Sequence, residues 1–318
     1  MAQKTISICI PVYNEAENVA AAVEAVESMF RDDLPGYALE IVVTDNGSTD
    51  ASWEVVRQLG ASRPHLRAAR FSRNFGYQNS VFAGLSLATG DAVIELDADL
   101  EDPPHVIPRF VAEWERGHHV VYGIRAKRYG SPVMRALFAA YYRLFNRIAN
   151  IDIPVDAGDF RLLDRKVVEV LKLLPERHLY LRGLVPYLGF RQAGIRYERQ
   201  PRRSGVSKFR GLHYVLLALD AMTAFSVAPL RWVGVLGVIS FFVAFLLALY
   251  YLFGYLAYGA PVAGFPTLVI LVLGLQSINF MILSLIGEYL GRVFDGVKNR
   301  PRVVVDETLN IDQPPRTL

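Results

Sequence analysis

The chain has 318 residues, of which 52% are hydrophobic and 20% charged, and its formal net charge is +3. The charged fraction is below the quarter or so that is usual for soluble domains, because no charged residue occurs between Trp232 and Gly287. The small net charge indicates no nucleic-acid partner, and the single cysteine, Cys9, excludes an intramolecular disulfide.

The first 125 residues alternate short β-branched runs with amphipathic segments of helix length. The spacing predicts strands over 6–12, 39–44, 66–71, 92–96 and 120–122. Helices are expected between them, over 15–30, up to about 59, over 78–88 and over 104–116. This alternation predicts an α/β fold, a Rossmann-like and mostly parallel sheet with helices on both faces.

Polar side chains gather where these strands end, and in parallel sheets ligands bind outside the carboxyl ends of the strands. They are Tyr13, Asn14, Glu15, Asp45, Arg73, Asn74, Asp97 and Asp99. No G-x-G-x-x-G follows the first strand, and no G-x-x-x-x-G-K-[ST] occurs. Dinucleotide oxidoreductases and P-loop nucleotidases therefore lose their main support.

The stretch from Gly90 to Pro104 begins as an apolar strand and ends in a cluster of carboxylates. Asp97 and Asp99 are two residues apart, so in an extended chain both side chains share one face. Paired carboxylates suit Mg²⁺ or Mn²⁺, which usually brings phosphates with it. An acidic turn that keeps a strand end soluble is the alternative, and the neighbouring polar strand ends favour the metal site.

The middle of the chain is more irregular. Met134–Ile148 has the pattern of a basic amphipathic helix. An acidic spot at 156–161 precedes a helix expected over about 164–174, and a basic segment follows at 196–210. Such a charge run is often only a solvated surface, but its place before a membrane segment favours phosphate binding.

Two apolar segments, about 232–256 and about 265–288, are each long enough to cross a bilayer. Arg231 precedes the first and Arg292 follows the second, so the positive-inside rule places both ends in the cytoplasm. A buried hairpin of a soluble protein is the alternative. The expected organisation is a cytoplasmic catalytic domain (1–207), an interfacial amphipathic helix (208–230), a two-helix membrane part (231–291) and a cytoplasmic tail (292–318).

Five motifs in order resemble the inverting family 2 glycosyltransferases, and among them the polyisoprenyl-phosphate glycosyltransferases, which include bactoprenol glucosyltransferases and dolichol-phosphate mannose synthases. The motifs are Pro11-Val12-Tyr13-Asn14-Glu15, Asp45-Asn46-Gly47-Ser48, Ser72-Arg73-Asn74-Phe75-Gly76, Leu96-Asp97-Ala98-Asp99-Leu100-Glu101-Asp102-Pro103-Pro104 and Gly158-Asp159-Phe160-Arg161-Leu162. The match covers nearly the whole chain, and each motif alone is weak.

The resemblance implies a GT-A fold that binds a nucleotide-diphosphate sugar with Mg²⁺ or Mn²⁺ as cofactor. It places Asp97 near the ribose and diphosphate, and Asp99, together with Asp97, at the metal. Asn46 stands where the family usually has a second aspartate, and its amide brings a donor as well as an acceptor. The residues expected around the nucleotide are Pro11, Tyr13, Glu15, Asp45, Asn46 and Asp97.

Asp159 matches the family's base, and the resemblance makes Asp159, Asp99 and Arg161 the expected catalytic residues. A lipid monophosphate, with a second pKa of about 6, is mostly ionised near neutrality. Base and positioning roles for Asp159 therefore both stay open, beside a purely structural salt bridge. Arg199, Arg202 and Lys208 are expected to bind the lipid phosphate.

The expected reaction is inverting transfer of a sugar to polyprenyl phosphate, with glucose from UDP-glucose and undecaprenyl phosphate as the leading pair. GDP-mannose and other UDP-sugars remain alternatives, as does a non-catalytic, membrane-tethered nucleotide-binding protein. A processive synthase is disfavoured because its Gln-x-x-Arg-Trp motif does not occur. The expected location is the cytoplasmic membrane, as a multi-pass protein with the catalytic domain in the cytoplasm, and homo-oligomers are expected.

Overall fold

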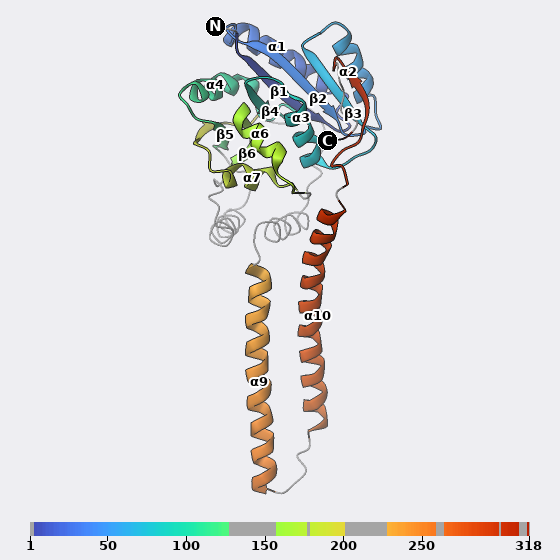
Figure 1. Cartoon of the computed structure of the whole chain (residues 1–318), viewed down its shortest axis with the longest axis vertical. Helices are drawn as coiled ribbons and strands as arrows, with labels where there is room; N and C mark the ends of the chain where they lie inside the picture. The colour runs from blue at the N-terminus through green and yellow to red at the C-terminus, as the bar shows by residue number, and fades with distance from the viewer. Residues whose placement is uncertain are drawn as a thin grey trace. The chain divides into compact units, whose positions relative to one another are not determined.

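A computed structural model describes residues 3–126, 157–176, 179–200, 228–258, 264–298, 300–311 and 317. The chain divides into two compact units, Met1–Arg210 with Arg300–Leu318, and Gly211–Asn299 (Figure 1). The helix expected over 134–148 and most of the interfacial segment expected over 208–230 lie outside the described residues, so both stay predictions.

One sheet organises the first unit, and its described strands follow the order β7-β5-β6-β4-β1-β2-β3-β8. Their bounds are β1 Thr5–Val12, β2 Ala38–Asp45, β3 Leu66–Phe71, β4 Ala92–Glu95, β5 Val120–Arg125, β6 Ala157–Asp164, β7 Gln192–Tyr197 and β8 Val305–Leu309. The pairs β1–β2, β1–β4, β2–β3 and β5–β7 are parallel. The pairs β4–β6, β5–β6 and β3–β8 are antiparallel.

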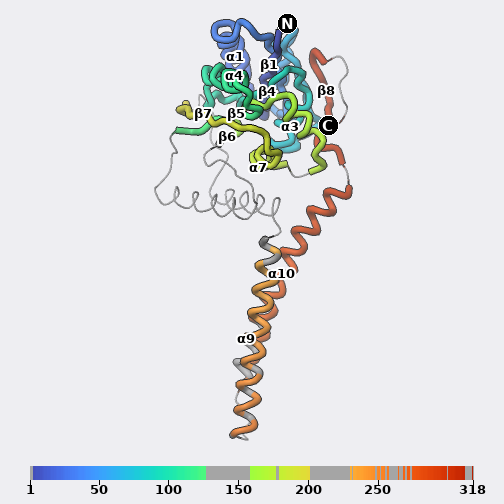
Figure 2. The backbone as a smooth tube through the Cα atoms, turned by 60° about the vertical axis from the view of Figure 1, so that its left-hand side comes forward, coloured from blue at the N-terminus to red at the C-terminus, as the bar shows by residue number. Residues whose placement is uncertain are grey.

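Helices cover the sheet on both faces. They are α1 Val19–Asp33, α2 Ser52–Ala61, α3 Tyr77–Leu87, the 3₁₀ turn η1 Pro104–Val106, α4 Ile107–Glu115, α6 Arg165–Leu173 and α7 Leu181–Tyr187. Figure 2 shows α1 and α4 on one side of the strands and α3 on the other. The mixed, mostly parallel sheet between helices confirms the predicted α/β class.

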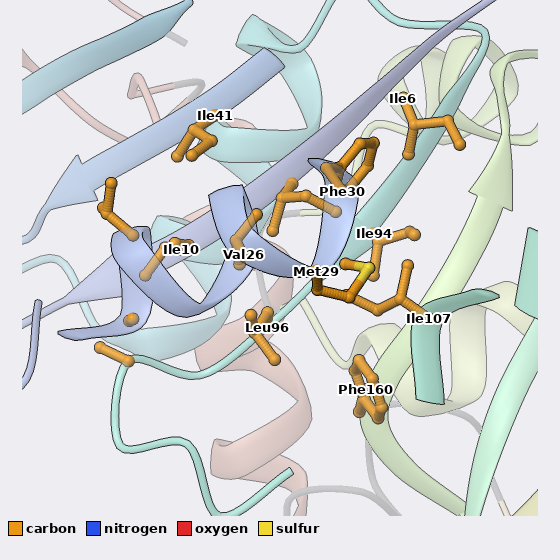
Figure 3. Packing of buried hydrophobic residues seen from close by; sticks show 14 of the residues in the cluster. Ile6, Ile10, Val26, Met29, Phe30, Ile41, Ile94, Leu96, Ile107 and Phe160 are labelled. Carbon is orange, nitrogen blue, oxygen red and sulfur yellow. The ribbon is translucent and has the colours of Figure 1, made fainter. Parts of the chain in front are cut away.

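The main core lies between the sheet and α1 (Figure 3). Ile6 and Ile10 of β1 alternate with residues that face the other side, as the period of two in a strand requires, and both are fully buried. Met29 and Phe30 of α1 and Ile94 of β4 belong to the same cluster. This core holds β1 and β4 in place, and so fixes the strand ends that carry the polar residues.

Three strands escaped the sequence analysis. The segment interpreted as an acidic spot forms part of β6, which lies between β4 and β5. Asp159 and Arg161 occupy this strand, and their charges hide its apolar alternation. β7 and β8 are edge strands of the sheet, where half-exposed polar sequences give only a weak pattern.

The second unit contains two long helices, α9 Ala228–Tyr258 and α10 Phe265–Val297. Among the described residues one stretch, Trp232–Gly254, is long and apolar enough to cross a membrane, with 23 residues and a mean hydropathy of 2.6. It corresponds to the first predicted span. The second predicted span lies within α10, and its membrane crossing stays a prediction.

The C-terminal segment, expected only as a cytoplasmic tail, adds a strand to the first unit. β8 pairs antiparallel with β3. The Asn310 Nδ2 donates to the carbonyl oxygen of Leu66 at 2.8 Å, and a Cβ on Gly60 would meet the side chain of Leu309 at 2.1 Å. This close approach to a glycine and the side-chain anchor fix the position of β8 along the edge.

Candidate active site

The strand ends β1 to β4 meet at one edge of the sheet because these strands are parallel. Two loops at this edge are joined directly. The Asn14 backbone N–H donates to Ser48 Oγ at 3.0 Å, and the Glu15 N–H donates to Ser52 Oγ at 2.9 Å. Asn14 has φ +54°, which asparagine tolerates better than most residues. Pro11 is buried, and Tyr13 and Glu15 are partly exposed on this edge.

Asp45 ends β2 as a fully buried carboxylate. Its Oδ1 accepts from the Ser48 N–H at 3.2 Å. Its Oδ2 has no hydrogen-bond partner among the described residues, although the Arg70 Nε lies 3.4 Å away. Burial raises the pKa of Asp45, and the Ser48 bonds and Arg70 offset only part of this rise. A buried acceptor without a partner is rare in native proteins, so Asp45 has the character of a ligand-binding group.

Asn46 holds the next loop instead of facing outward. Its Oδ1 accepts from the Phe75 N–H at 2.9 Å, and its Nδ2 donates to Asn74 Oδ1 at 3.1 Å. Gly47 follows with φ +70°, and a Cβ there would lie 2.6 Å from the backbone carbon of Arg73. The amide predicted to contact a base is thus engaged within the protein, and its influence on a ligand passes through the loop after β3.

The predicted metal residues follow β4. Asp97 Oδ1 accepts from the Tyr77 hydroxyl at 2.8 Å, and the same hydroxyl lies 3.1 Å from Glu95 Oε1. Asp99 is 8% exposed, and its Oδ1 accepts from the Glu101 N–H at 3.1 Å. Leu100, between Asp99 and Glu101, has φ +55°, a strained conformation of the kind that clusters at functional sites.

The surroundings of Asp97 disfavour its ionised form. Burial raises its pKa to about 7, and the charges of Asp99, Asp159 and Asp102 add to this rise, while the Tyr77 hydrogen bond opposes it. No group of three or more side chains suited to metals occurs among the described residues. Two carboxylates suffice for Mg²⁺, however, when phosphate oxygens and waters complete its coordination. Asp97 and Asp99 therefore fit a divalent cation that arrives with a diphosphate.

Asp159 in β6 has the opposite environment. The Arg182 Nε donates to its Oδ1 at 2.8 Å, a second Arg182 nitrogen contacts its Oδ2, and the Arg161 Nη2 donates to its Oδ1 at 2.9 Å. Burial would raise its pKa, but Arg182, Arg161 and Arg125 lower it to about 2. Asp159 is thus an ionised carboxylate bound by arginines. Arg182 was missed in the sequence, where a lone basic residue in the apolar run 179–188 was its signal.

Arg161, predicted as a catalytic residue, is buried beside Asp159 in β6. It is 4% exposed, and its Nη1 donates to the carbonyl oxygen of Leu181 at 3.2 Å. It stands opposite Glu95 in the β4–β6 register, with its Nε 3.8 Å from Glu95 Oε2. Glu95 was also missed, although a charge within the apolar run 92–96 indicates a special role. Burial and the neighbouring Asp159 charge raise the pKa of Glu95 well above its usual range.

Asp102 ties the acidic loop to the end of β7. It accepts from the Tyr197 hydroxyl at 2.5 Å and from the Arg199 Nε at 3.1 Å. Arg199 also lies 2.5 Å from Glu101 Oε2. Arg199, predicted to bind a lipid phosphate, is thus paired with two carboxylates. The two other residues predicted for this role, Arg202 and Lys208, lie outside the described residues.

Comparison with known proteins assigns the chain to a family. Residues 7–172 match the model of the family described as "Glycosyl transferase family 2". The SfII prophage-derived bactoprenol glucosyl transferase of Shigella flexneri is 36% identical over 95% of this chain and 98% of its own length. The prophage bactoprenol glucosyl transferase homolog of Escherichia coli (strain K12) is 36% identical over 94% of this chain and 98% of its own length.

Among solved structures, glucosyl-3-phosphoglycerate synthase of Mycobacterium tuberculosis, in complex with Mn²⁺, UDP and phosphoglyceric acid, is similar with a TM-score of 0.49. It is 20% identical over 69% of this chain and 76% of its own, which is too distant a match to support a functional inference. The two relatives and the family description are sufficient without it. The chain belongs to glycosyltransferase family 2.

The chain is therefore a glycosyltransferase, which confirms the predicted class of enzyme and the family resemblance read from the five motifs. The family match and the observed sheet together support the GT-A fold that the resemblance implies. A protein that only binds nucleotides without catalysis is set aside.

Proposed function

We propose that the protein transfers glucose from UDP-glucose to undecaprenyl phosphate, with inversion, at the cytoplasmic face of a membrane. The observation that carries this proposal is the contrast at one sheet edge. Asp97 and Asp99 bring two carboxylates to the end of β4, where the pKa of Asp97 is raised to about 7, while Asp159 is bound by Arg182 and Arg161. The first suits a metal-bound diphosphate, and the second suits a site for an anionic acceptor. The two relatives named bactoprenol glucosyl transferases support the choice of sugar and lipid.

The leaving-group side is assigned to Asp97 and Asp99, which would hold Mg²⁺ or Mn²⁺. A divalent cation there neutralises the charge that develops on a departing diphosphate. The Tyr77 hydroxyl fixes the orientation of the Asp97 carboxylate. Glu101, through its backbone N–H, does the same for Asp99.

The nucleotide side is assigned to the β1 and β2 ends. Asp45 Oδ2, buried and without a hydrogen-bond partner among the described residues, would accept an N–H of the base. Pro11, Tyr13 and Glu15 would border the base and ribose. Guanine also offers a ring N–H, so GDP-mannose is the second donor to be tested, beside other UDP-sugars.

The acceptor side is assigned to β6 and α7. A lipid monophosphate is largely ionised near neutrality, so it can attack the anomeric carbon without a strong base. Asp159, with its pKa lowered to about 2, is a poor proton acceptor. Its proposed role is to orient Arg182, whose side chain is 29% exposed, toward the incoming phosphate. Arg161 also binds Asp159 and helps to hold it in place. The proposed contacts of the lipid head group are still Arg199, Arg202 and Lys208.

Attachment of the enzyme to the membrane would allow the lipid acceptor to reach the active site. A long-chain lipid phosphate presents its head group at the bilayer surface, where α9 would hold the enzyme. A multi-pass arrangement and homo-oligomers remain parts of the proposal that rest on the sequence.

The proposal is tested with the full chain in detergent or nanodiscs, undecaprenyl phosphate, and a panel of labelled UDP-glucose, UDP-galactose and GDP-mannose. We expect a glucosyl lipid from UDP-glucose, and loss of the product when EDTA is added. Transfer only to water would contradict the lipid acceptor. Equal product in EDTA would contradict the metal.

The metal assignment has its own variant. Asp99→Asn should lower the turnover number about a hundredfold or more, the scale of losing a preorganised electrostatic group. Asp91→Asn is the matched control. This aspartate directly precedes β4, and its Oδ2 accepts from the Thr5 N–H at 2.8 Å, a bond that an amide oxygen can replace. Transfer by Asp99→Asn at the rate of the control would overturn the assignment.

A further inference from the structure

We propose that Glu307 of the C-terminal strand β8 is a positioning residue of the nucleotide site, acting through Arg70 on Asp45. The inference rests on the proposed role of Asp45 in binding the nucleotide. It adds to that role a residue far away in sequence, in a segment that follows both long helices. It also gives β8 a task beyond closing the sheet edge.

The contacts form a short chain from β8 to the end of β2. Glu307 Oε1 lies 3.4 Å from the Arg70 Nη1. The same guanidinium lies 3.4 Å from the Ser48 carbonyl oxygen through Nη2, and 3.4 Å from Asp45 Oδ2 through Nε. Arg70 is therefore shared among two carboxylates and a carbonyl group, and no single partner holds it closely.

The place of Glu307 is fixed by more than this ion pair. Glu307 stands opposite Arg70 in the β3–β8 register. Its Oε2 accepts from the Trp53 Nε1 of α2 at 3.0 Å. Trp53 is 4% exposed, so it is a rigid donor. The carboxylate of Glu307 is thus held in place before Arg70 contributes anything.

The pull of Glu307 on Arg70 has a consequence for Asp45. Arg70 lies near enough to favour the ionised form of this buried carboxylate, yet Asp45 Oδ2 keeps no hydrogen bond within the described residues. Without the charge of Glu307, the contacts of the guanidinium that remain among the described residues are those with Asp45 and Ser48. A closer Arg70–Asp45 pair would occupy the oxygen that is proposed to accept from the base. Loss of Glu307 should therefore weaken nucleotide binding and leave the transfer step unchanged.

Glu307→Gln tests this with little disturbance of the fold. The amide oxygen of glutamine can still accept from Trp53, so the change is confined to the side that faces Arg70, which loses the charge and its acceptor oxygen. Asp306→Asn is the matched control, because it removes the same charge from the adjacent residue, which is exposed and alternates to the other face of the strand.

The measurements use the full chain with Mg²⁺ or Mn²⁺ present. For Glu307→Gln we expect the KM for UDP-glucose to rise about twofold to fivefold, the scale of a partly exposed ion pair. The turnover number and the KM for undecaprenyl phosphate should match those of Asp306→Asn. The rise in melting temperature caused by UDP should be smaller in Glu307→Gln than in the control. In an Arg70→Gln background, Glu307→Gln should add nothing, because coupled residues are not additive.

Equal donor KM and equal UDP-induced shifts in Glu307→Gln and Asp306→Asn would overturn the inference. A lower melting temperature of Glu307→Gln with unchanged donor binding would also overturn it, because Glu307 would then contribute to stability alone. Absence of transfer by the unmutated protein would contradict the proposed function instead. The UDP-induced shift still decides the role of Glu307 in that case.

Discussion

Asp97 and Asp159 are the same residue type at the same sheet edge, yet their neighbours shift their pKa values in opposite directions. Burial and three nearby carboxylates raise the pKa of Asp97 to about 7. Asp159 is also buried, but its arginine partners lower its pKa to about 2. This difference supports the proposal that Asp97 binds a cation, while Asp159 orients arginines toward an anionic acceptor.

The Asp159–Arg182 pair predicts a pH effect. A carboxylate whose pKa is lowered by folding stabilises the fold above its ordinary pKa, and this contribution is lost as pH falls toward the folded value of about 2. Arg182→Gln removes the largest favourable charge, so the pKa of Asp159 should rise. The variant should lose more stability at pH 7 than at pH 3, measured by chemical denaturation.

The same variant should move the acid limb of the profile of unfolding free energy against pH to higher pH. Arg57→Gln is the control, because the ion pair of Arg57 within the described part of the chain is an exposed one with Glu54 on the surface of α2. Profiles of the two variants that coincide between pH 4 and pH 8 would argue against an ionised, arginine-bound Asp159.

At this scale the sequence predicted the carboxylates but not their partners. Asp97 and Asp99 follow from a spacing of two after an apolar strand, and Asp159 follows from a motif. Tyr77, Glu95 and Arg182 come from three different elements, and only the fold brings them to the acidic residues. Contacts between residues far apart in sequence leave no local pattern.

Among the elements, the buried ones were the most predictable. The strand predicted over 66–71 is the observed β3. β1 and β4 differ from the prediction by one residue at one end, and β2 differs by one residue at each end. The mostly apolar runs of β1 and β4 reflect burial on both faces. β6 is also an inner strand but was missed. Its Asp159 and Arg161 are charged residues at positions where a buried strand usually has apolar ones.

Helix α6 gives a prediction about a single cap. Asp164 Oδ1 accepts from the Lys166 N–H at 2.9 Å at the start of this helix, and its Oδ2 accepts from the Trp114 Nε1 of α4 at 2.7 Å. Asp164→Ala removes the cap and leaves the largely buried indole N–H unpaired. The variant should lose about 1–3 kcal/mol of unfolding free energy, measured by denaturant titration.

Asp33→Ala is the comparison for that experiment. Asp33 is exposed at the last residue of α1, where a negative charge opposes the helix dipole. Its replacement should leave the unfolding free energy unchanged or slightly higher. A loss in Asp164→Ala no larger than in this variant would show that the cap contributes nothing.

For the whole molecule, the charge-free region coincides with the two long helices of the second unit, α9 and α10. Tryptophan, phenylalanine and leucine side chains of α9 are exposed in the structure, as expected for a surface that contacts lipid. A patch of this size is rare on soluble monomers. Composition alone was enough to predict the long apolar segments of α9 and α10, while the strand contributed by the C-terminal segment was not predictable from composition.

Ala244→Arg tests the membrane role of α9. A charge at the centre of a spanning helix costs roughly 2.5–3.5 kcal/mol of insertion free energy. The variant should be released from membranes by an alkaline wash more than the unmutated protein. Tyr187→Arg introduces the same charge at a 61% exposed residue of the first unit and should remain membrane-bound. Equal retention of both variants would contradict a spanning α9.

The position of β8 has a consequence for biosynthesis. β3 is complete once residue 71 has been made, but its partner strand begins at Val305, after both long helices. During translation β3 is therefore an open sheet edge, the kind of surface that pairs with other chains. The ribosome must finish both helices before this edge closes, so any pause during the synthesis of α9 and α10 prolongs the exposure. A slow passage through this region would then appear as aggregation of the catalytic unit.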